Sequence, residues 1–310
     1  MQAGTREQRL RWPGEKVDAV IDTDAYNEID DLYAIAYMLR SNNKIVTRAI
    51  IAAPFYSPAA LGRVRQTQNP AEGMELSYRA IEQLLDIMDM GDRKSLLFRG
   101  AKIALKDEVT PAESEGIQEI IRLAREHTPD RPLYVIGIAV LTDIASAILK
   151  APDIVDKIVV VWLGGHGYDY IKAYDFNALQ DIAAARVVFG SGAVIVHLPC
   201  MNVISDLTVT KTDLEENLHK KNKLCTYLLD LSVSFMREKM KTDEWVKPLW
   251  DVSAVAWLIN PDFMETKLQS SPVFEYDDTY RFEEGRPIIR TVIRIDRHRV
   301  LTDMFFKLSR

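Results

Sequence analysis

The 310-residue sequence has little of two residue types that define common protein classes. It contains only two cysteines and five histidines. Cys200 and Cys225 are too few for a disulfide framework or a thiolate metal site. The histidines are scattered and show no paired spacing, so they do not predict zinc. These shortages argue against a disulfide-stapled protein and against a zinc enzyme.

Long apolar runs and an excess of positive charge are also missing. No run approaches the ~18 apolar residues of a transmembrane helix. The first twenty residues carry many charged side chains and lack the apolar segment of a secretory signal. The formal net charge is -6 with acids and bases interspersed, whereas a nucleic-acid-binding protein requires a basic face. We therefore expect a cytoplasmic protein that binds neither membrane nor nucleic acid.

Apolar runs rich in β-forming residues alternate with helical patterns over most of the chain. Ile45–Ile51, Leu133–Gly137 and Ile158–Leu163 are typical of buried strands, and amphipathic helical patterns lie between them. This alternation predicts an α/β fold with a mostly parallel central sheet flanked by helices and a Rossmann-like core. No linker-like segment divides the chain, so we expect one domain over residues 1–310, with residues 1–15 as a flexible N-terminal extension.

The densest group of acidic residues lies between the first predicted strand and its helix. Four Asp and one Glu fall within residues 22–31. Their mutual repulsion is costly unless a cation, a helix dipole or solvent offsets it. Calcium and magnesium bind carboxylate and carbonyl oxygens, and calcium tolerates irregular loop geometry. We expect a divalent-cation site here; the alternative is that Asp30 and Asp31 only cap the helix while Asp22 and Asp24 are solvated.

Two motifs carry a family resemblance. Asp22-Thr23-Asp24 followed by Asp30-Asp31 and an apolar helix resembles the N-terminal signature of the nucleoside hydrolases, the inosine-uridine and inosine-adenosine-guanosine-preferring enzymes. Trp250-Asp251 before an apolar helix resembles the late metal-ligating Asp of that family. The segment Ala25–Ile29 is longer than the family's usual form, so we expect an altered loop over the metal.

The resemblance implies a nucleoside substrate, Ca²⁺ as cofactor, and assembly as a homodimer or homotetramer. It assigns Asp24 as general base and metal ligand, joined by Asp31, Asp251 and the backbone carbonyl of Thr142. The expected reaction is metal-dependent hydrolysis of the N-glycosidic bond of ribonucleosides to free base and ribose. Trp250 implies a preference for purines, because the purine-preferring branch stacks the base on a Trp at this place. The expected substrate contacts are Asn27, Asp30, Phe55, Asp169, Asp175, Asn177 and Trp250.

Each assignment has a structural alternative. Phe55 and Trp250 are large enough to serve as core residues, and Thr142 and Asp251 stand where helix caps would. Two alternative functions also remain open. Departures from the family pattern at Phe55 and Asp175 favour a non-catalytic ribose- or nucleoside-binding protein of the same fold. A haloacid-dehalogenase-like phosphatase also places Asp-x-Asp after a buried strand, but the residues after Asp24 fit that pattern poorly.

Overall fold

The computed structural model describes residues 3–310, with side chains described from residue 6. Within this range eight strands form one central sheet in the order β3-β2-β1-β4-β5-β6-β12-β9. The neighbouring strands are parallel, except that β9 runs antiparallel to β12. The strands are β1 (Val17–Thr23), β2 (Ile45–Ala52), β3 (Leu97–Arg99), β4 (Leu133–Gly137), β5 (Ile158–Leu163), β6 (Val194–Leu198), β9 (Met264–Ser270) and β12 (Ile288–Ile295). The predicted α/β fold with a mostly parallel sheet is confirmed.

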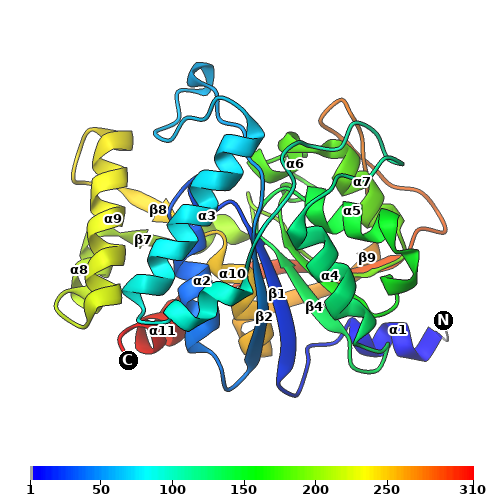
Figure 1. The fold of residues 1–310 in the computed structure, drawn as a ribbon, viewed down its shortest axis with the longest axis horizontal. Coiled ribbons are helices and arrows are strands. Elements are labelled where there is room, and N and C mark those ends of the chain that lie inside the picture. Colours follow the sequence, from blue (N-terminus) through cyan, green and yellow to red (C-terminus); the bar gives the residue numbers. More distant parts are fainter. Residues whose placement is uncertain (1–2) are drawn as a thin grey trace.

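Helices cover both faces of the sheet (Figure 1). One face packs against α2 (Asp30–Arg40), α3 (Pro70–Ile87), α10 (Val252–Ile259) and α11 (Arg297–Leu308). The other packs against α4 (Glu115–Arg125), α5 (Thr142–Lys150) and α7 (Ile182–Gly190). Along β1, Ile21 joins the first core and Val20 the second, because successive side chains of a strand point to opposite faces. Burial on both faces explains why the strands are continuous apolar runs in the sequence.

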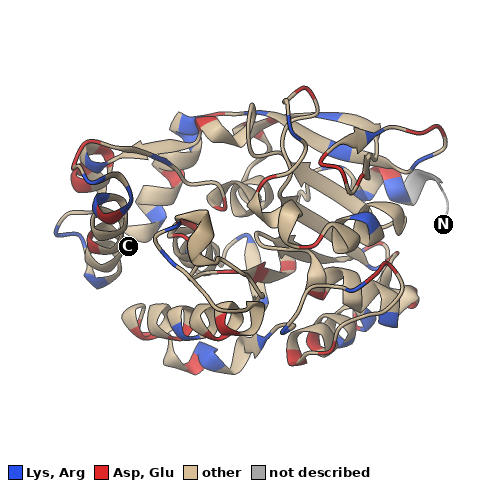
Figure 2. Ribbon diagram, turned by 90° about the horizontal axis from the view of Figure 1, so that it is seen from above, with Lys and Arg blue, Asp and Glu red and all other residues tan. Residues whose placement is uncertain are grey.

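Smaller elements surround this three-layer arrangement. Helices α8 (Lys211–Leu218) and α9 (Lys223–Met240) lie outside α3, next to the two-stranded sheet of β7 (Thr208–Thr210) and β8 (Val246–Pro248) (Figure 1). A second small sheet pairs β10 (Val273–Phe274) with β11 (Tyr280–Arg281), and α6 (Phe176–Gln180) precedes α7. None of the described helices is long and apolar enough to cross a membrane. Lys and Arg are interspersed with Asp and Glu along the outer helices (Figure 2).

Part of the expected N-terminal extension, residues 1–15, contacts the rest of the domain. Residues Ala3–Arg9 form helix α1, and the Arg6 guanidinium donates a hydrogen bond to the backbone carbonyl of Ala193 at 3.1 Å. Leu10 is 1% exposed and belongs to the first core. The segment from Arg6 to Leu10 therefore packs on the domain, and burial of the apolar Leu10 side chain favours this packing.

Candidate active site

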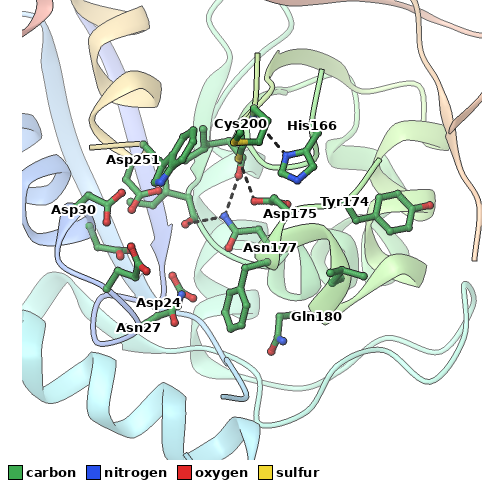
Figure 3. A pocket seen from close by; sticks show the side chains of 18 of the residues that line it. Asp24, Asn27, Asp30, His166, Tyr174, Asp175, Asn177, Gln180, Cys200 and Asp251 are labelled. Carbon is green, nitrogen blue, oxygen red and sulfur yellow. Dashed lines mark hydrogen bonds between the residues drawn. The ribbon is translucent and has the colours of Figure 1, made fainter. Parts of the chain in front are cut away.

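A cavity of about 600 Å³ opens beyond the carboxyl ends of the central strands. This is the edge at which open α/β sheets bind their ligands, because the residues that follow neighbouring parallel strands meet there. Acidic residues from both sequence anchors line one wall. Figure 3 shows on that wall Asp24, Asp30 and Asp251, and on the opposite one Asp175, Asn177, Cys200 and His166.

The acidic wall joins two segments that lie far apart in the sequence. Asp30 and Asp31 begin α2, and Asp251 precedes α10, which packs against α2. One carboxylate oxygen from each of these three residues lies within 4.8 Å of the others. The Thr23 hydroxyl donates to Asp31 Oδ1 at 2.6 Å. The Asp251 side chain makes no capping hydrogen bond to α10, so its helix-cap alternative does not hold.

Burial and repulsion make this wall expensive in the absence of a cation. Burial, and then the Asp31 charge, raise the pKa of Asp24 well above its ordinary value, and the pKa of Asp251 is raised by the same two causes in the same order. Burial, followed by the charge of Asp30, raises the pKa of Asp31 to about 7. Asn27 also lines the cavity, and its side-chain oxygen is buried without a hydrogen-bond partner among the described residues. Carboxylate and amide oxygens in this arrangement fit a hard divalent cation.

Thr142 does not reach the cavity. It lies in the first turn of α5, fully buried, where its hydroxyl donates to Asp181 Oδ2 at 2.7 Å. The residue of this segment that lines the cavity is Ile138, immediately after β4. The Ile138 carbonyl faces the opposite wall, because it accepts a hydrogen bond from Asn177 Nδ2 at 3.3 Å. Thr142 is therefore not among the residues that line the cavity, and its expected role as a carbonyl ligand stays a prediction.

Asp175 and Asn177 line the opposite wall, as the resemblance implies, and both are tied to the backbone. Asp175 caps α6: its Oδ1 accepts from the backbone N–H of Gly165 at 2.7 Å and of Ala178 at 2.9 Å. The Cys200 thiol donates to Asp175 Oδ2 at 3.1 Å. Asn177 Nδ2 donates to the carbonyl groups that follow β4 and end β5. These bonds fix the two side chains before any ligand arrives.

Of three expected substrate contacts, Trp250 lines the cavity, whereas Phe55 and Asp169 do not. Phe55 is 1% exposed and packs in the core beneath α3, where the missing side chain of Gly73 leaves room for it. Asp169 is exposed, because a turn closed by the Tyr170 N–H donating to the Gly167 carbonyl at 2.8 Å carries it to the surface. Neither residue lines the cavity, whereas Trp250 does so and is half-buried.

Several cavity-lining residues were not predicted from the sequence. Arg63, in the loop after β2, lies 3.3 Å from Glu28 Oε1, and its guanidinium stacks 4.0 Å from the ring centre of Phe176. The Tyr56 N–H donates to Gln180 Oε1 at 2.7 Å, which also ties this loop to α6. The signal available in the sequence was the length of the loop between Ser57 and Asn69, since long ordered loops at this edge often cover a site. Other cavity-lining residues not expected are Leu61, His166, Tyr174, Leu179, Cys200 and Met201.

Two further buried carboxyl groups lie outside the cavity. Neither Asp22 oxygen has a hydrogen-bond partner among the described residues, and Asp143 Oδ2 also lacks one. Asp143 Oδ1 accepts from the backbone N–H of Ala101 and the hydroxyl of Ser114, both at 2.9 Å. Burial, and then the charge of Asp143, raise the pKa of Asp22 well above its ordinary value. Burial raises the pKa of Asp143 to about 6.

We expect the Asp143→Asn variant to be more stable than the wild type at neutral pH, by about 1–3 kcal/mol. A carboxyl whose pKa is raised by folding contributes stability below its unfolded pKa, and that stability is lost as the pH rises through the folded value, here about 6. The amide keeps the shape of the side chain and removes one of the two interacting charges. Urea unfolding with a chelator present, at pH values on both sides of 6, measures the effect.

The matched control is Asp153→Asn, which removes an exposed carboxylate paired with Arg125 at 2.9 Å. Its unfolding curves should follow those of the wild type, because exposed ion pairs contribute little. An Asp143→Asn curve that shows the wild-type dependence on pH would contradict the explanation.

Enzymes with an open α/β sheet bind their ligands beyond the carboxyl ends of the strands, and buried acids at that place suit a divalent cation. Residues 19–302 match the inosine-uridine preferring nucleoside hydrolase family, and the chain belongs to that family. The predicted family is thereby confirmed.

Individual relatives are distant. The pyrimidine-specific ribonucleoside hydrolase RihA of Enterobacter sp. (strain 638) is 25% identical over 202 residues, which cover 60% of this chain and 63% of that protein. A plant nucleoside hydrolase, PpNRh1, has a similar structure, with a TM-score of 0.72 at 18% identity over 94% of this chain and 99% of that one. A purine-preferring ribonucleoside hydrolase from Gardnerella vaginalis also has a TM-score of 0.72, at 19% identity over 94% and 98% of the two chains. At these identities the structural likeness shows the fold.

Proposed function

We propose that this protein hydrolyses the N-glycosidic bond of ribonucleosides, with a preference for purines and with Ca²⁺ bound among its buried acids. The observation that carries the proposal is the meeting of Asp24, Asp30, Asp31 and Asp251 in one cavity, although the sequence separates Asp251 from the others by more than 200 residues. So many buried carboxylates are costly for stability, and a cation together with a positively charged transition state accounts for them.

The reaction sets two demands on the residues. Cleavage of the bond to the base passes through an oxocarbenium-like sugar, which acidic groups stabilise, and it needs a water molecule that loses a proton. Asp24, Asp31 and Asp251, which all line the cavity, would hold the calcium ion. When bound, the ion would act as a Lewis acid, lowering the pKa of water and orienting the sugar hydroxyls.

The remaining roles follow from position in the cavity. Asp24 accepts the proton of the attacking water. Asp30 accepts a hydrogen bond from a ribose hydroxyl, and Asp175 and Asn177 contact the sugar from the opposite wall. Asn27 offers its unpartnered side-chain oxygen to the ion or the sugar. Trp250 presents its ring to the leaving base, and the larger face of a purine gains more from stacking on it.

The test is release of free ribose from a panel of purine and pyrimidine nucleosides, with and without a calcium chelator. We expect release that stops on chelation, returns when Ca²⁺ is restored, and is faster for purines. Equal or faster release from pyrimidines would remove the assigned role of Trp250. Calcium binding with no release from any nucleoside would favour the non-catalytic binding protein instead. Light scattering on the same samples checks the proposed homodimer or homotetramer.

A further inference from the structure

Lys247, in β8, is a buried lysine immediately behind the acidic wall. Its side chain is 3% exposed, and the cavity-lining residues do not include it. The ammonium contacts Glu28 Oε2 at 2.7 Å and Asp30 Oδ1 at 3.0 Å, and it donates to the Pro248 carbonyl at 2.7 Å. A lysine ammonium has three N–H donors, and these contacts use all of them. Lys247 therefore has no donor left for a ligand and acts through its partners.

Glu28 is the residue that allows a charged lysine to be buried here. Besides Lys247, it contacts Arg63 from the loop after β2 at 3.3 Å and Lys239 near the end of α9 at 2.8 Å. It lies in the segment Ala25–Ile29, whose extra length sets this chain apart from the usual family signature. An isolated buried ammonium is costly, and the paired carboxylates of Glu28 and Asp30 offset that cost. The longer loop and Lys247 therefore form one unit.

This unit determines what Asp30 can do. The ammonium occupies Asp30 Oδ1, so the other carboxylate oxygen is the one available to the cavity that Asp30 lines. A carboxylate partly neutralised by a neighbouring ammonium is a weaker ligand for a divalent cation than Asp31 or Asp251, because the two cations repel each other. The same contact makes Asp30 a rigid, charged hydrogen-bond acceptor, which suits a sugar hydroxyl.

We propose that Lys247 is a positioning residue for sugar recognition: it holds Asp30 so that the free carboxylate oxygen accepts a ribose hydroxyl, and it thereby makes the enzyme select ribonucleosides over deoxyribonucleosides. The inference rests on the proposed hydrolase function. A site built to bind a hydroxyl discriminates strongly against an analogue that lacks it, because the buried acceptor is then left unpaired.

The test compares kcat/KM for one ribonucleoside and its 2′-deoxy and 3′-deoxy analogues in the wild type and in Lys247→Met. We expect the wild type to favour the ribonucleoside over at least one analogue, and Lys247→Met to reduce that ratio by about 10- to 100-fold, the range of one hydrogen bond to a charged group. The substitution should lower kcat/KM for the ribonucleoside and leave kcat/KM for the deoxy analogue nearly unchanged. The conservative variant Lys247→Arg keeps the charge, so its preference for the ribonucleoside should lie between those of Lys247→Met and the wild type.

Lys239→Met is the matched control, because Lys239 also pairs with Glu28 but has no contact with Asp30 among the interactions of the described residues. Its ratio should equal that of the wild type. Calcium affinity, measured by calorimetry, should be unchanged or tighter in Lys247→Met, since a cation near the site is removed. A parallel loss of calcium binding would mean that Lys247 only maintains the metal pocket, and the inference would be overturned.

Two outcomes separate this inference from the proposed function. If the wild type cleaves no nucleoside, the hydrolase proposal itself fails. If the wild type prefers ribonucleosides and Lys247→Met keeps that preference, only the role of Lys247 fails. Should Lys247→Met not fold, the double variant Glu28→Gln/Lys247→Met removes the ammonium and the Glu28 carboxylate together. It should show the same loss of preference for the ribonucleoside. Failure of both to fold would assign Lys247 a structural role and overturn the inference.

Discussion

Replacing Asp24 by Asn is expected to lower kcat for ribonucleoside hydrolysis by about 10²–10⁴-fold, the range for loss of a general base. Asn has the same shape but cannot accept the proton of the attacking water. Asp24 is 3% exposed and lines the cavity beside Asp30 and Asp31. Ribose release at saturating nucleoside and saturating Ca²⁺ measures kcat separately from metal affinity.

The control for this variant is Asp230→Asn, on the exposed side of α9, which should have the kcat of the wild type. Calcium affinity should also weaken in Asp24→Asn, because one of the ligand charges is lost. A variant that binds Ca²⁺ and retains near-full turnover would show that another group removes the proton from water. The assignment of Asp24 would then be wrong, although the metal site could stand.

The fold and the group of acids at the first strand end could be predicted from the sequence, because both depend on strong local signals. Strands buried on both faces are continuous apolar runs, and β4 and β5 have the predicted bounds. Asp30 and Asp31 were recognisable because four Asp and one Glu fall within residues 22–31, more than helix capping explains, and Asp251 was recognisable through the family resemblance. The meeting of Asp251 with the N-terminal acids depends on α10 packing against α2. The family resemblance implied this long-range contact, but local sequence patterns do not reveal it.

The substrate contacts were harder to predict, because loop geometry decides them. Phe55 follows β2 as expected, yet the close approach of Gly73 creates a core site that takes its ring away from the cavity. Asp169 is carried outward by a turn that its sequence did not specify. Arg63 pairs with Glu28, and Lys247 pairs with both Glu28 and Asp30. Ion pairs between such distant positions leave no pattern in a single sequence.

Asp251 offers the sharpest test of the metal site. Its carboxylate is 6% exposed, and one of its oxygens lies within 4.8 Å of oxygens of Asp30 and Asp31. We expect Asp251→Asn to weaken Ca²⁺ binding by more than about 100-fold, which exceeds the usual effect of losing a group that only supports a ligand. The same substitution removes one of the repelling buried charges. The metal-free variant should therefore be more stable than the metal-free wild type, by about 1–2 kcal/mol.

Calorimetric titration with Ca²⁺, combined with urea unfolding in chelator, measures both effects of Asp251→Asn. Binding to the wild type should weaken as the pH falls below about 7, since the raised pKa of Asp31 means that the ion must displace a proton there. One displaced proton corresponds to about tenfold in affinity per pH unit. Lower metal affinity together with higher metal-free stability would identify Asp251 as a ligand. Substitution of a residue with only a structural role would lower both the metal affinity and the metal-free stability. Wild-type affinity in Asp251→Asn would place the ion elsewhere in the cavity and remove Asp251 from the mechanism.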